Sequence, residues 1–461
     1  MKTIFTWCMV LLLSTPFSLK ASDPWLQADS ILNVIKEPQF PDRSFRITDY
    51  KGKAGGNFDN TKVINRLIDR CNKAGGGKVV IPEGVFFTGP ITLKSNVNLH
   101  LEEGAILKFS NNPADYTPFV ETRWEGMDVI NYRPLIYANG VTNIAVTGKG
   151  KLDGQATNET WWWMKGRTNF GWDKSMPSQY DTGRPKLMDW VDNNTPIKER
   201  VLTQQDLLRP QFISPIHSSN ILIEGVTIVD APFWVIHTIF CNNIIVRNVS
   251  IISHGPNNDG CNPESCQNVL IEGSTFDTGD DCIAIKSGRN NDGRNIPIPS
   301  ENIIVRNCYM KDGHGGIVMG SEISAGVRNV FVEDCKMDSP DLKRVVRIKS
   351  NTVRGGFVDG LYLRNINVGE CGGPVFIIEL DYEPEDGVGD FPPVIKNIVM
   401  ENVTSNKSEY GVHIKGLEDS IQISNIDFIN CHFNNVVYPV SISGAKNINF
   451  KNFNTSVVQV K

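Results

Sequence analysis

The chain has 461 residues, of which 40% are hydrophobic and 21% are charged, and its formal net charge is −5 at pH 7. This is the composition of a globular protein with a large apolar core. The net negative charge argues against a general polyanion-binding surface, so no nucleic-acid partner is expected. An anionic substrate would have to be held by a local cluster of cations.

The first residues have the features of a secretory signal peptide. A lysine precedes the apolar stretch Ile4–Leu13, and small residues follow it. This stretch is too short to span a bilayer. We therefore expect residues 1–21 to be a signal peptide. The mature chain, 22–461, is expected to be exported to the periplasm or out of the cell, without membrane insertion.

A capping helix is predicted within the segment DNTKVINRLIDRCNKAG, which starts at Asp59. Asn60 or Thr61 can cap its start, and Gly75 to Gly77 end it. The apolar stripe of this helix consists of Val63, Ile64, Leu67, Ile68 and Cys71. We expect an N-terminal cap over about residues 46–95, since the open end of a repeat protein exposes an apolar cross-section.

A short strand phrase recurs through the rest of the chain. It reads NIAVTG, NILIEG, NIIVRN, NVLIEG, NIIVRN and NVFVED at starts 143, 220, 243, 268, 302 and 329. Later copies are GLYLRN, NIVMEN, SIQISN and NINFKN at 360, 397, 420 and 447. Each copy alternates apolar and polar residues and has asparagine, glycine or aspartate as a turn signal beside it.

The spacing of this phrase predicts the fold class. The shortest step between starts is 23 residues, from 220 to 243. A βαβ unit needs about 30 residues, and the leucine signature of leucine-rich repeats is absent. The pattern therefore indicates an all-β fold, a right-handed single-stranded parallel β-helix, whose coils stack about 4.8 Å apart.

The segment 154–219 interrupts the repeat and contains WWWMKGRTNFGW. Two interpretations are open. It is either a folded loop that covers the side of the solenoid or a wall of a sugar-binding cleft, because aromatic faces pack well against sugar C–H groups.

Nine cysteines remain in the chain after the predicted signal peptide. They form no CxxC metal pattern and no dense disulfide framework. Several fall in apolar strand patterns, where a thiol behaves as a small buried hydrophobe. Only Cys261 and Cys266 lie close enough in sequence to invite a local disulfide. No metal or nucleotide motif is found, so no cofactor is expected.

The repeat places several polar residues in register. Asp280 lies 12 residues after Asn268, and His314 lies 12 after Asn302, so the two should occupy the same position in adjacent coils. Asp281 adjoins Asp280, and Asp259 lies one coil earlier. By the same offset, 18 residues, Lys286 and Arg347 should also align.

Stacked carboxylates of this kind suit glycoside hydrolysis. Three neighbouring carboxylates repel one another, so some pKa values should rise and one acid should stay protonated. One carboxylic acid then protonates the leaving oxygen, and a carboxylate activates water or attacks directly. Arg347 and Lys349 alternate on one face of a strand and could clamp a sugar carboxylate.

Four ordered motifs resemble those of the polygalacturonases, glycoside hydrolase family 28. They are NNDG at 257, GDD at 279, GHG at 313 and RIK at 347. The resemblance implies a right-handed β-helix and inverting hydrolysis of α-1,4 bonds between galacturonic acid units. The substrate partner would be a pectic polysaccharide or an oligogalacturonide. Asn258 departs from the motif, which commonly has threonine there.

The resemblance also implies roles for individual residues. Asp280 would be the general acid, while Asp259 and Asp281 would position and activate the water. His314 would tune the protonation of the acid. The residues implied or expected to bind substrate or hold the site are Arg347, Lys349, Asn257, Lys286 and Arg289.

Exo action is expected, because the insertion 154–219 and the loop KSGRNNDGRNIP could wall off one end of the groove. Arg289 and Arg294 in that loop could recognise a terminal uronate. The main alternative is hydrolysis of rhamnogalacturonan or substituted pectin, although His314 favours galacturonan. A calcium-dependent pectate lyase and a non-catalytic carbohydrate-binding β-helix are more distant alternatives.

Overall fold

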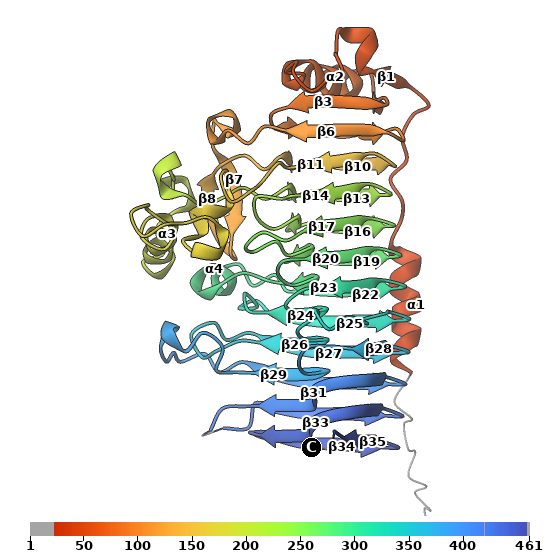
Figure 1. Ribbon diagram of the computed structural model, residues 1–461, viewed down its shortest axis with the longest axis vertical. Coiled ribbons are helices and arrows are strands. Elements are labelled where there is room, and N and C mark those ends of the chain that lie inside the picture. Colours follow the sequence, from red (N-terminus) through yellow and green to blue (C-terminus); the bar gives the residue numbers. More distant parts are fainter. Residues whose placement is uncertain (1–22, 419, 459–461) are drawn as a thin grey trace, which may run out of the picture.

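The chain winds into a solenoid of stacked coils, with short strands joined by turns (Figure 1). The computed structural model describes residues 23–418 and 420–458. The expected signal peptide, residues 1–21, lies outside the described residues. All pairings between neighbouring coils in the long sheets are parallel, which confirms the predicted parallel β-helix.

Three parallel sheets run along the solenoid. The first contains β1 Ser44–Arg46, β2 Gly77–Ile81, β5 Val97–Leu101, β10 Thr142–Gly148, β13 Ser219–Glu224, β16 Asn242–Arg247, β19 Gln267–Glu272, β22 Ser300–Arg306, β25 Val327–Glu333, β27 Phe357–Arg364, β30 Val394–Glu401, β32 Ile423–Ile429 and β34 Ala445–Lys451. The second contains β3 Gly84–Thr88, β6 Ala105–Phe109, β11 Lys151–Asp153, β14 Thr227–Val229, β17 Ser250–Ser253, β20 Thr275–Thr278 and β23 Tyr309–Asp312.

The third sheet contains the strands that follow the turns with Asp259, Asp280 and His314. It contains β4 Ile91–Thr92, β9 Ile136–Asn139, β12 Ile213–Ile216, β15 Ile236–Ile239, β18 Cys261–Glu264, β21 Ile283–Ile285, β24 Ile317–Gly320, β26 Val346–Lys349, β29 Phe376–Glu379, β31 Thr404–Lys415, β33 His432–Ser443 and β35 Asn454–Val457, with β28 Asn367–Glu370 beside β31. An antiparallel hairpin, β7 Val120–Trp124 and β8 Met127–Asn131, projects from the coils.

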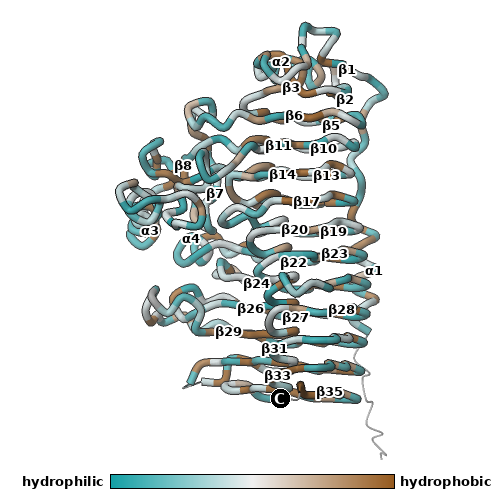
Figure 2. Tube along the Cα trace, viewed as in Figure 1, coloured by the Kyte–Doolittle hydropathy of each residue, from teal (hydrophilic) through white to brown (hydrophobic). Residues whose placement is uncertain are grey.

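Alternate side chains of each strand fill the interior. Figure 2 shows apolar residues recurring along the strands of successive coils. A single buried cluster extends from Phe45 to Val436 and includes one column after another of isoleucine, valine and leucine. The period-two pattern read from the sequence therefore specifies the core.

The asparagine that begins most copies of the repeat forms a ladder between coils. Asn220, Asn243, Asn268, Asn302 and Asn329 all have left-handed backbone angles, with φ between 53° and 58°. The Nδ2 of Asn243 donates to the Oδ1 of Asn220 at 2.8 Å, and Asn302 donates to Asn268 at 3.2 Å. Asparagine suits this position because its short amide tolerates the left-handed region and pairs with its own copy one coil away.

The N-terminal end is covered by helix α2, Thr61–Lys73. Its buried residues are those of the predicted stripe, Val63, Ile64, Leu67, Ile68 and Cys71. The predicted cap was wrong in detail. Asn60 occupies the N-cap position, but its amide bonds to the carbonyls of Lys53, Phe58 and Phe87. The carboxylate of Asp59 instead accepts from the backbone of Thr61 at 2.9 Å.

A second N-terminal helix was not predicted. Helix α1, Pro24–Val34, lies along the outer face of the first sheet, several coils away from α2 (Figure 1). Its residues Ala28 and Ile31, with Ile35 after it, cover the apolar column formed by Ala145, Leu222, Ile245, Leu270, Ile304 and Phe331. This explains why the outward position of those strands is apolar.

The insertion and the loops carry the remaining helices. Two α-helices are α3 Gly183–Asp192 and α4 Asn290–Asn295. The 3₁₀ turns are η1 Ile47–Tyr50, η2 Pro113–Tyr116, η3 Trp162–Lys165, η4 Thr168–Phe170, η5 Ile197–Glu199, η6 Gln204–Asp206 and η7 Pro384–Asp386. Within residues 23–418 and 420–458, no helix is long and apolar enough to cross a membrane.

The cysteines in the described part of the chain are all buried and free, so the suggested bridge between Cys261 and Cys266 is not formed. Cys261 begins strand β18 and Cys266 follows the strand's end. The extended strand β18 lies between the two cysteines and rises about 3.3 Å per residue, which keeps the thiols too far apart for a disulfide. The prediction that the cysteines behave as buried hydrophobes is confirmed.

We expect Asn302→Ala to lower the free energy of unfolding by about 2 kcal/mol. Alanine is less stable than asparagine in the left-handed backbone conformation, and it lacks the amide that bonds to both neighbouring coils. The midpoint of urea unfolding measures this change. Asn406→Ala is the control, because Asn406 is exposed in β31 and outside the ladder. Equal stability of the two variants would contradict a structural role for the ladder.

Candidate active site

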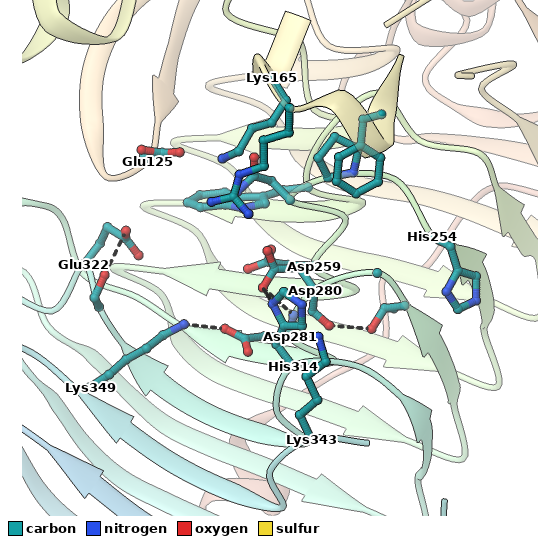
Figure 3. Close-up of a pocket in the computed structure, with 18 of the residues that line it drawn as sticks. Glu125, Lys165, His254, Asp259, Asp280, Asp281, His314, Glu322, Lys343 and Lys349 are labelled. Atoms are coloured by element: carbon teal, nitrogen blue, oxygen red, sulfur yellow. Dashed lines mark hydrogen bonds and ion pairs between the residues drawn. The ribbon is translucent and has the colours of Figure 1, made fainter. Parts of the chain in front are cut away.

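A cleft of about 640 Å³ opens beside the turns that lead into β18, β21 and β24 (Figure 3). Eight of the nine predicted site residues line it, namely Asn257, Asp259, Asp280, Asp281, Lys286, His314, Arg347 and Lys349. The ninth, Arg289, does not. Successive coils between residues 250 and 350 thus each contribute side chains to one surface, although 92 positions separate Asn257 from Lys349 in the sequence.

The acids occupy the same turn of successive coils, between the second and third sheets. Backbone bonds stack these turns directly: the amide of His314 donates to the carbonyl of Asp280 at 3.0 Å, and that of Gly260 to Asp281 at 2.9 Å. A Cβ at Gly279 would lie 2.5 Å from the carbonyl oxygen of Gly255. Glycine at this position therefore permits the close stacking that brings the acids together.

Asp280 is paired with His314, as the shared offset predicted. The Nδ1 of His314 lies 3.1 Å from the Oδ1 of Asp280. Burial opposes ionisation of Asp280, but the hydrogen bond and charge of His314, with Lys349 and Lys165, outweigh it and lower the pKa of Asp280.

Asp259 has the opposite tendency. Its burial and the nearby charge of Asp280 raise its pKa well above the ordinary value, although Lys286 works against this. The Nζ of Lys286 lies 3.6 Å from its Oδ2, and Asn262 donates to the same oxygen at 3.1 Å. The set therefore contains one carboxyl group with a raised pKa, Asp259, and one with a lowered pKa, Asp280. Repulsion between stacked acids predicted that at least one pKa would rise.

Asp281 and the two cations of the RIK motif are already engaged. The Nζ of Lys349 donates to the Oδ2 of Asp281 at 2.7 Å. Arg347 donates through Nε and Nη2 to Glu379 at 2.9 and 2.7 Å. Both cations also line the cleft, so each can contact a ligand while it is paired with a carboxylate.

The predicted alignment of Lys286 with Arg347 is wrong by two residues. Ile285 pairs with Met319, and Met319 with Ile348, so the residue after Ile285 aligns with Lys349. The offset counted from the start of the coil fails because the turns between the two strands differ in length. Lys286 lies among Asp259, Glu322 at 2.9 Å and the ring of Trp234 at 4.4 Å.

The NNDG turn is held in place by hydrogen bonds from neighbouring residues. Arg209 donates to the Oδ1 of Asn257 at 2.9 Å. The fully buried Asn258 accepts from Ser253 and from the amide of Gly255, and its Nδ2 donates to two backbone carbonyls. Asn258, the departure from the family motif, is thus a structural residue of the turn rather than part of the cleft.

One end of the cleft is crossed by ion pairs between distant segments. Arg184 of α3 lies 3.1 Å from Glu125 in the turn of the β7–β8 hairpin and 3.8 Å from Glu383 in the loop after β29. Figure 3 places Glu125 and Glu322 on one side of the three aspartates and His254 on the other. The cleft is therefore walled at the Glu125 end.

Arg289 supports this wall from behind. Its side chain is 1% exposed and lies 3.6 Å from Glu125, 3.6 Å from Glu383 and 3.3 Å from Asp386. Arg294 donates instead to backbone carbonyls, including that of Val353 at 2.9 Å. The expectation that these arginines contact a terminal uronate does not match their positions, since neither lines the cleft.

The insertion 154–219 combines the two interpretations offered for it. Trp161 is buried in the core, and Trp162 and Trp163 pack against it, so the tryptophans cover the solenoid. Other residues of the insertion line the cleft, namely Lys165, Arg167, Asn169, Phe170, Tyr180 and Arg184. The cleft wall is thus formed mainly by cations and polar groups rather than by the tryptophans.

Sequence reasoning missed several residues of the cleft because they lie in insertions or in turns, outside the recurring strand phrase. They are Glu125, Lys165, Tyr180, Arg184, Trp234, Glu322, Lys343, Tyr382 and Glu383. The signal that could have found some of them is the concentration of Lys and Arg within the insertion.

One group in the described residues has the composition of a metal site. Ligand atoms of His254, Asp277 and Asp312 lie within 4.8 Å of one another. However, Asp277 already pairs with Lys311 and with His254, which makes the cluster a charge network. The absence of a metal cofactor stays a prediction.

Comparisons with known proteins agree on one family. Residues 182–392 match the sequence model of the glycosyl hydrolases family 28. The Exo-poly-alpha-D-galacturonosidase of Dickeya chrysanthemi is 28% identical over 457 residues, which cover 89% of this chain and 70% of that protein. A "Probable polygalacturonase" of Vitis vinifera is 27% identical over 337 residues; these cover 70% of this chain and only 60% of that relative.

The solved structures extend the similarity to nearly the whole chain. The crystal structure of a hyperthermoactive exopolygalacturonase from Thermotoga maritima matches with a TM-score of 0.89 and 38% identity. The match covers 94% of this chain and 96% of that chain. The structure of a family 28 exopolygalacturonase of Yersinia enterocolitica supports the fold. It has 22% identity and a TM-score of 0.72, and the match covers 91% of this chain and 76% of that chain.

We expect Arg289→Met to loosen the walled end while leaving the coils intact. The change leaves Glu125, Glu383 and Asp386 with one cation fewer in a buried network. Hydrogen exchange should therefore become faster in the β7–β8 hairpin and in residues 380–392, with little change in β19 and β22. Arg167→Met is the control, because Arg167 is exposed and has no carboxylate within 4 Å in the described chain. Unchanged exchange in both segments would contradict the supporting role.

Proposed function

The chain belongs to the glycosyl hydrolases of family 28, and on that premise we propose that it hydrolyses α-1,4 bonds between galacturonic acid units, acting from chain ends. The observation that carries this proposal is the set of three stacked carboxylates beside a wall that closes one end of the cleft. A walled cleft accepts the end of a polysaccharide and excludes its interior. The exopolygalacturonases among the relatives support the same activity.

The proposed reaction is an inverting hydrolysis. Asp280 acts as the general acid that protonates the leaving glycosidic oxygen, and Asp259 and Asp281 position and activate the attacking water. Lys349 holds the carboxylate of Asp281 in place through its 2.7 Å contact. His314 tunes Asp280 through the 3.1 Å contact.

The proton of the acid set must move when substrate binds. In the free enzyme Asp259 favours the protonated form and Asp280 the ionised form, because His314, Lys349 and Lys165 all stabilise the Asp280 charge. These two acids interact strongly, so the proton belongs to the pair. A uronate entering the cleft brings negative charge, which raises the Asp280 pKa and favours the protonated acid that the reaction needs.

Arg347, Lys349 and Lys286 form the cationic side of the cleft against which the uronate groups of the substrate lie. Asn257 holds the turn through Arg209, and Arg289 holds the wall. The neutralisation of Arg347 by Glu379 and of Lys349 by Asp281 leaves donors in fixed positions rather than mobile charges. Fixed donors favour one orientation of the sugar carboxylate.

Family membership argues against the pectate lyase and the non-catalytic binding module. It does not favour rhamnogalacturonan or substituted pectin, and His314, present here, supports a galacturonan substrate. We also propose that the protein is exported, on the basis of the signal-like residues 1–21, and that it needs neither a cofactor nor a nucleic-acid partner.

The test is to incubate the protein with polygalacturonic acid in the presence of a chelator and to follow the products over time. Galacturonic acid monomer should appear from the start, and Asp280→Asn should slow its release by about 10²- to 10⁴-fold, the usual contribution of a general acid. Early mixed oligomers would contradict end-on action. Ultraviolet-absorbing unsaturated products, formed only without chelator, would contradict hydrolysis.

We expect His314→Ala to move the limb of the kcat/KM profile that follows the ionisation of Asp280 to higher pH. The change removes the contact that lowers the Asp280 pKa, and a charge-assisted hydrogen bond of about 1.5–3 kcal/mol corresponds to about one to two pH units. Profiles of kcat/KM against pH for both enzymes measure this. His254→Ala is the control, because His254 also lines the cleft but contacts Asp277 at 2.8 Å. An unmoved limb in His314→Ala would contradict the assigned role.

A further inference from the structure

Lys165 is a buried cation that points into the cleft without an anionic partner. It ends the turn η3 of the insertion, and its residue is only 7% exposed. Figure 3 shows its side chain extending from the insertion into the cleft, above Asp259 and Asp280 and toward the side of Glu125. We propose that Lys165 binds the carboxylate of the galacturonate unit seated at the walled end of the cleft. This inference rests on the proposed function and assigns a specificity residue to it.

The other buried or half-buried cations of the cleft named here are already paired. Arg184, Lys286, Arg347 and Lys349 each have a carboxylate within 4 Å. Lys165 has none within 4 Å in residues 23–418 and 420–458. Its ammonium group faces the cleft with no carboxylate beside it, so it is available to a ligand that brings a negative charge. The missing charge is one carboxylate, which a uronate provides and a neutral sugar does not.

The position of Lys165 is fixed by its surroundings. Trp161 precedes η3 and is fully buried in the core, and the indole of Trp162 donates to the carbonyl of Ala231 at 3.0 Å. The ammonium of Lys165 lies 5.1 Å from the centre of the Tyr180 ring. The insertion thus holds the cation rigidly above the acids, which limits the entropy lost when it binds an anion.

Tyr180 and Arg184 link this cation to the walled end. The guanidinium of Arg184 lies 5.6 Å from the same Tyr180 ring and 3.1 Å from Glu125. A sugar held against Lys165 is therefore beside the wall and over the aspartates. Lys165 is also near enough to Asp280 to help lower its pKa, after His314 and Lys349. When a uronate neutralises Lys165, this contribution to keeping Asp280 ionised is removed.

The experiment compares the binding of galacturonate and galactose, which differ only at C6, by calorimetry. Wild-type protein should bind galacturonate more tightly than galactose. Lys165→Met, which keeps much of the apolar stem, should weaken galacturonate binding by about 10- to 100-fold, the factor that a charge-assisted hydrogen bond represents. Its affinity for galactose should stay unchanged. The KM for trigalacturonate should rise in parallel.

Two variants serve as controls. Lys165→Arg keeps the charge and should restore most of the preference for galacturonate. Lys174→Met removes an exposed lysine of the same insertion that does not line the cleft, and it should behave as wild type. If Lys165→Met is folded and still prefers galacturonate as strongly as wild type, the inference is overturned. If Lys165→Met fails to fold, failure of Lys165→Arg to bind galacturonate more tightly than galactose overturns it.

The failure of the proposed function has a different outcome. Wild-type protein that neither hydrolyses galacturonan nor distinguishes galacturonate from galactose would contradict the proposed function and the inference together. Wild-type protein that does both, with Lys165→Met equal to it, would overturn the role of Lys165 alone.

Discussion

The site depends on the parallel register between neighbouring coils. Each turn is bonded to the next through the backbone, as in the 3.0 Å bond from His314 to Asp280. A side chain therefore lies one strand spacing from its counterpart in the next coil, about 4.8 Å away. Acids that repel one another in solution are held together because the core and the asparagine ladder fix the coils on which they stand.

The same stacking that brings carboxylates together also brings their counter-ions. Lys349 pairs with Asp281, Lys286 lies beside Asp259, and His314 pairs with Asp280. The different partners separate the proton affinities of the acids, so that Asp259 and Asp280 are shifted in opposite directions. The repeat sets the acids in one place, and the residues around each acid decide its chemistry. The wall is different, because its ion pairs join a hairpin, an insertion and a late loop that share no repeat.

This difference explains what the sequence could predict. The fold followed from the period of NIIVRN and its relatives, and the stacking of Asp280 on His314 followed from equal offsets. The alignment of Lys286 with Arg347 failed because the turns that separate them differ in length. Helix α1 was missed because its partner is a column of outward-facing residues far along the chain. Lys165, Glu125 and Glu383 lie on segments without a repeat, so only tertiary packing brings them to the cleft.

The proposed reaction requires water to attack one face of the sugar while Asp280 protonates the leaving oxygen on the other. Proton NMR of the first galacturonic acid released from trigalacturonate tests this most directly, before the anomers equilibrate. Inverting hydrolysis gives the β anomer as the first product, because the configuration of the α linkage is inverted. The α anomer as first product would indicate a covalent intermediate on one of the acids and would contradict the assigned roles.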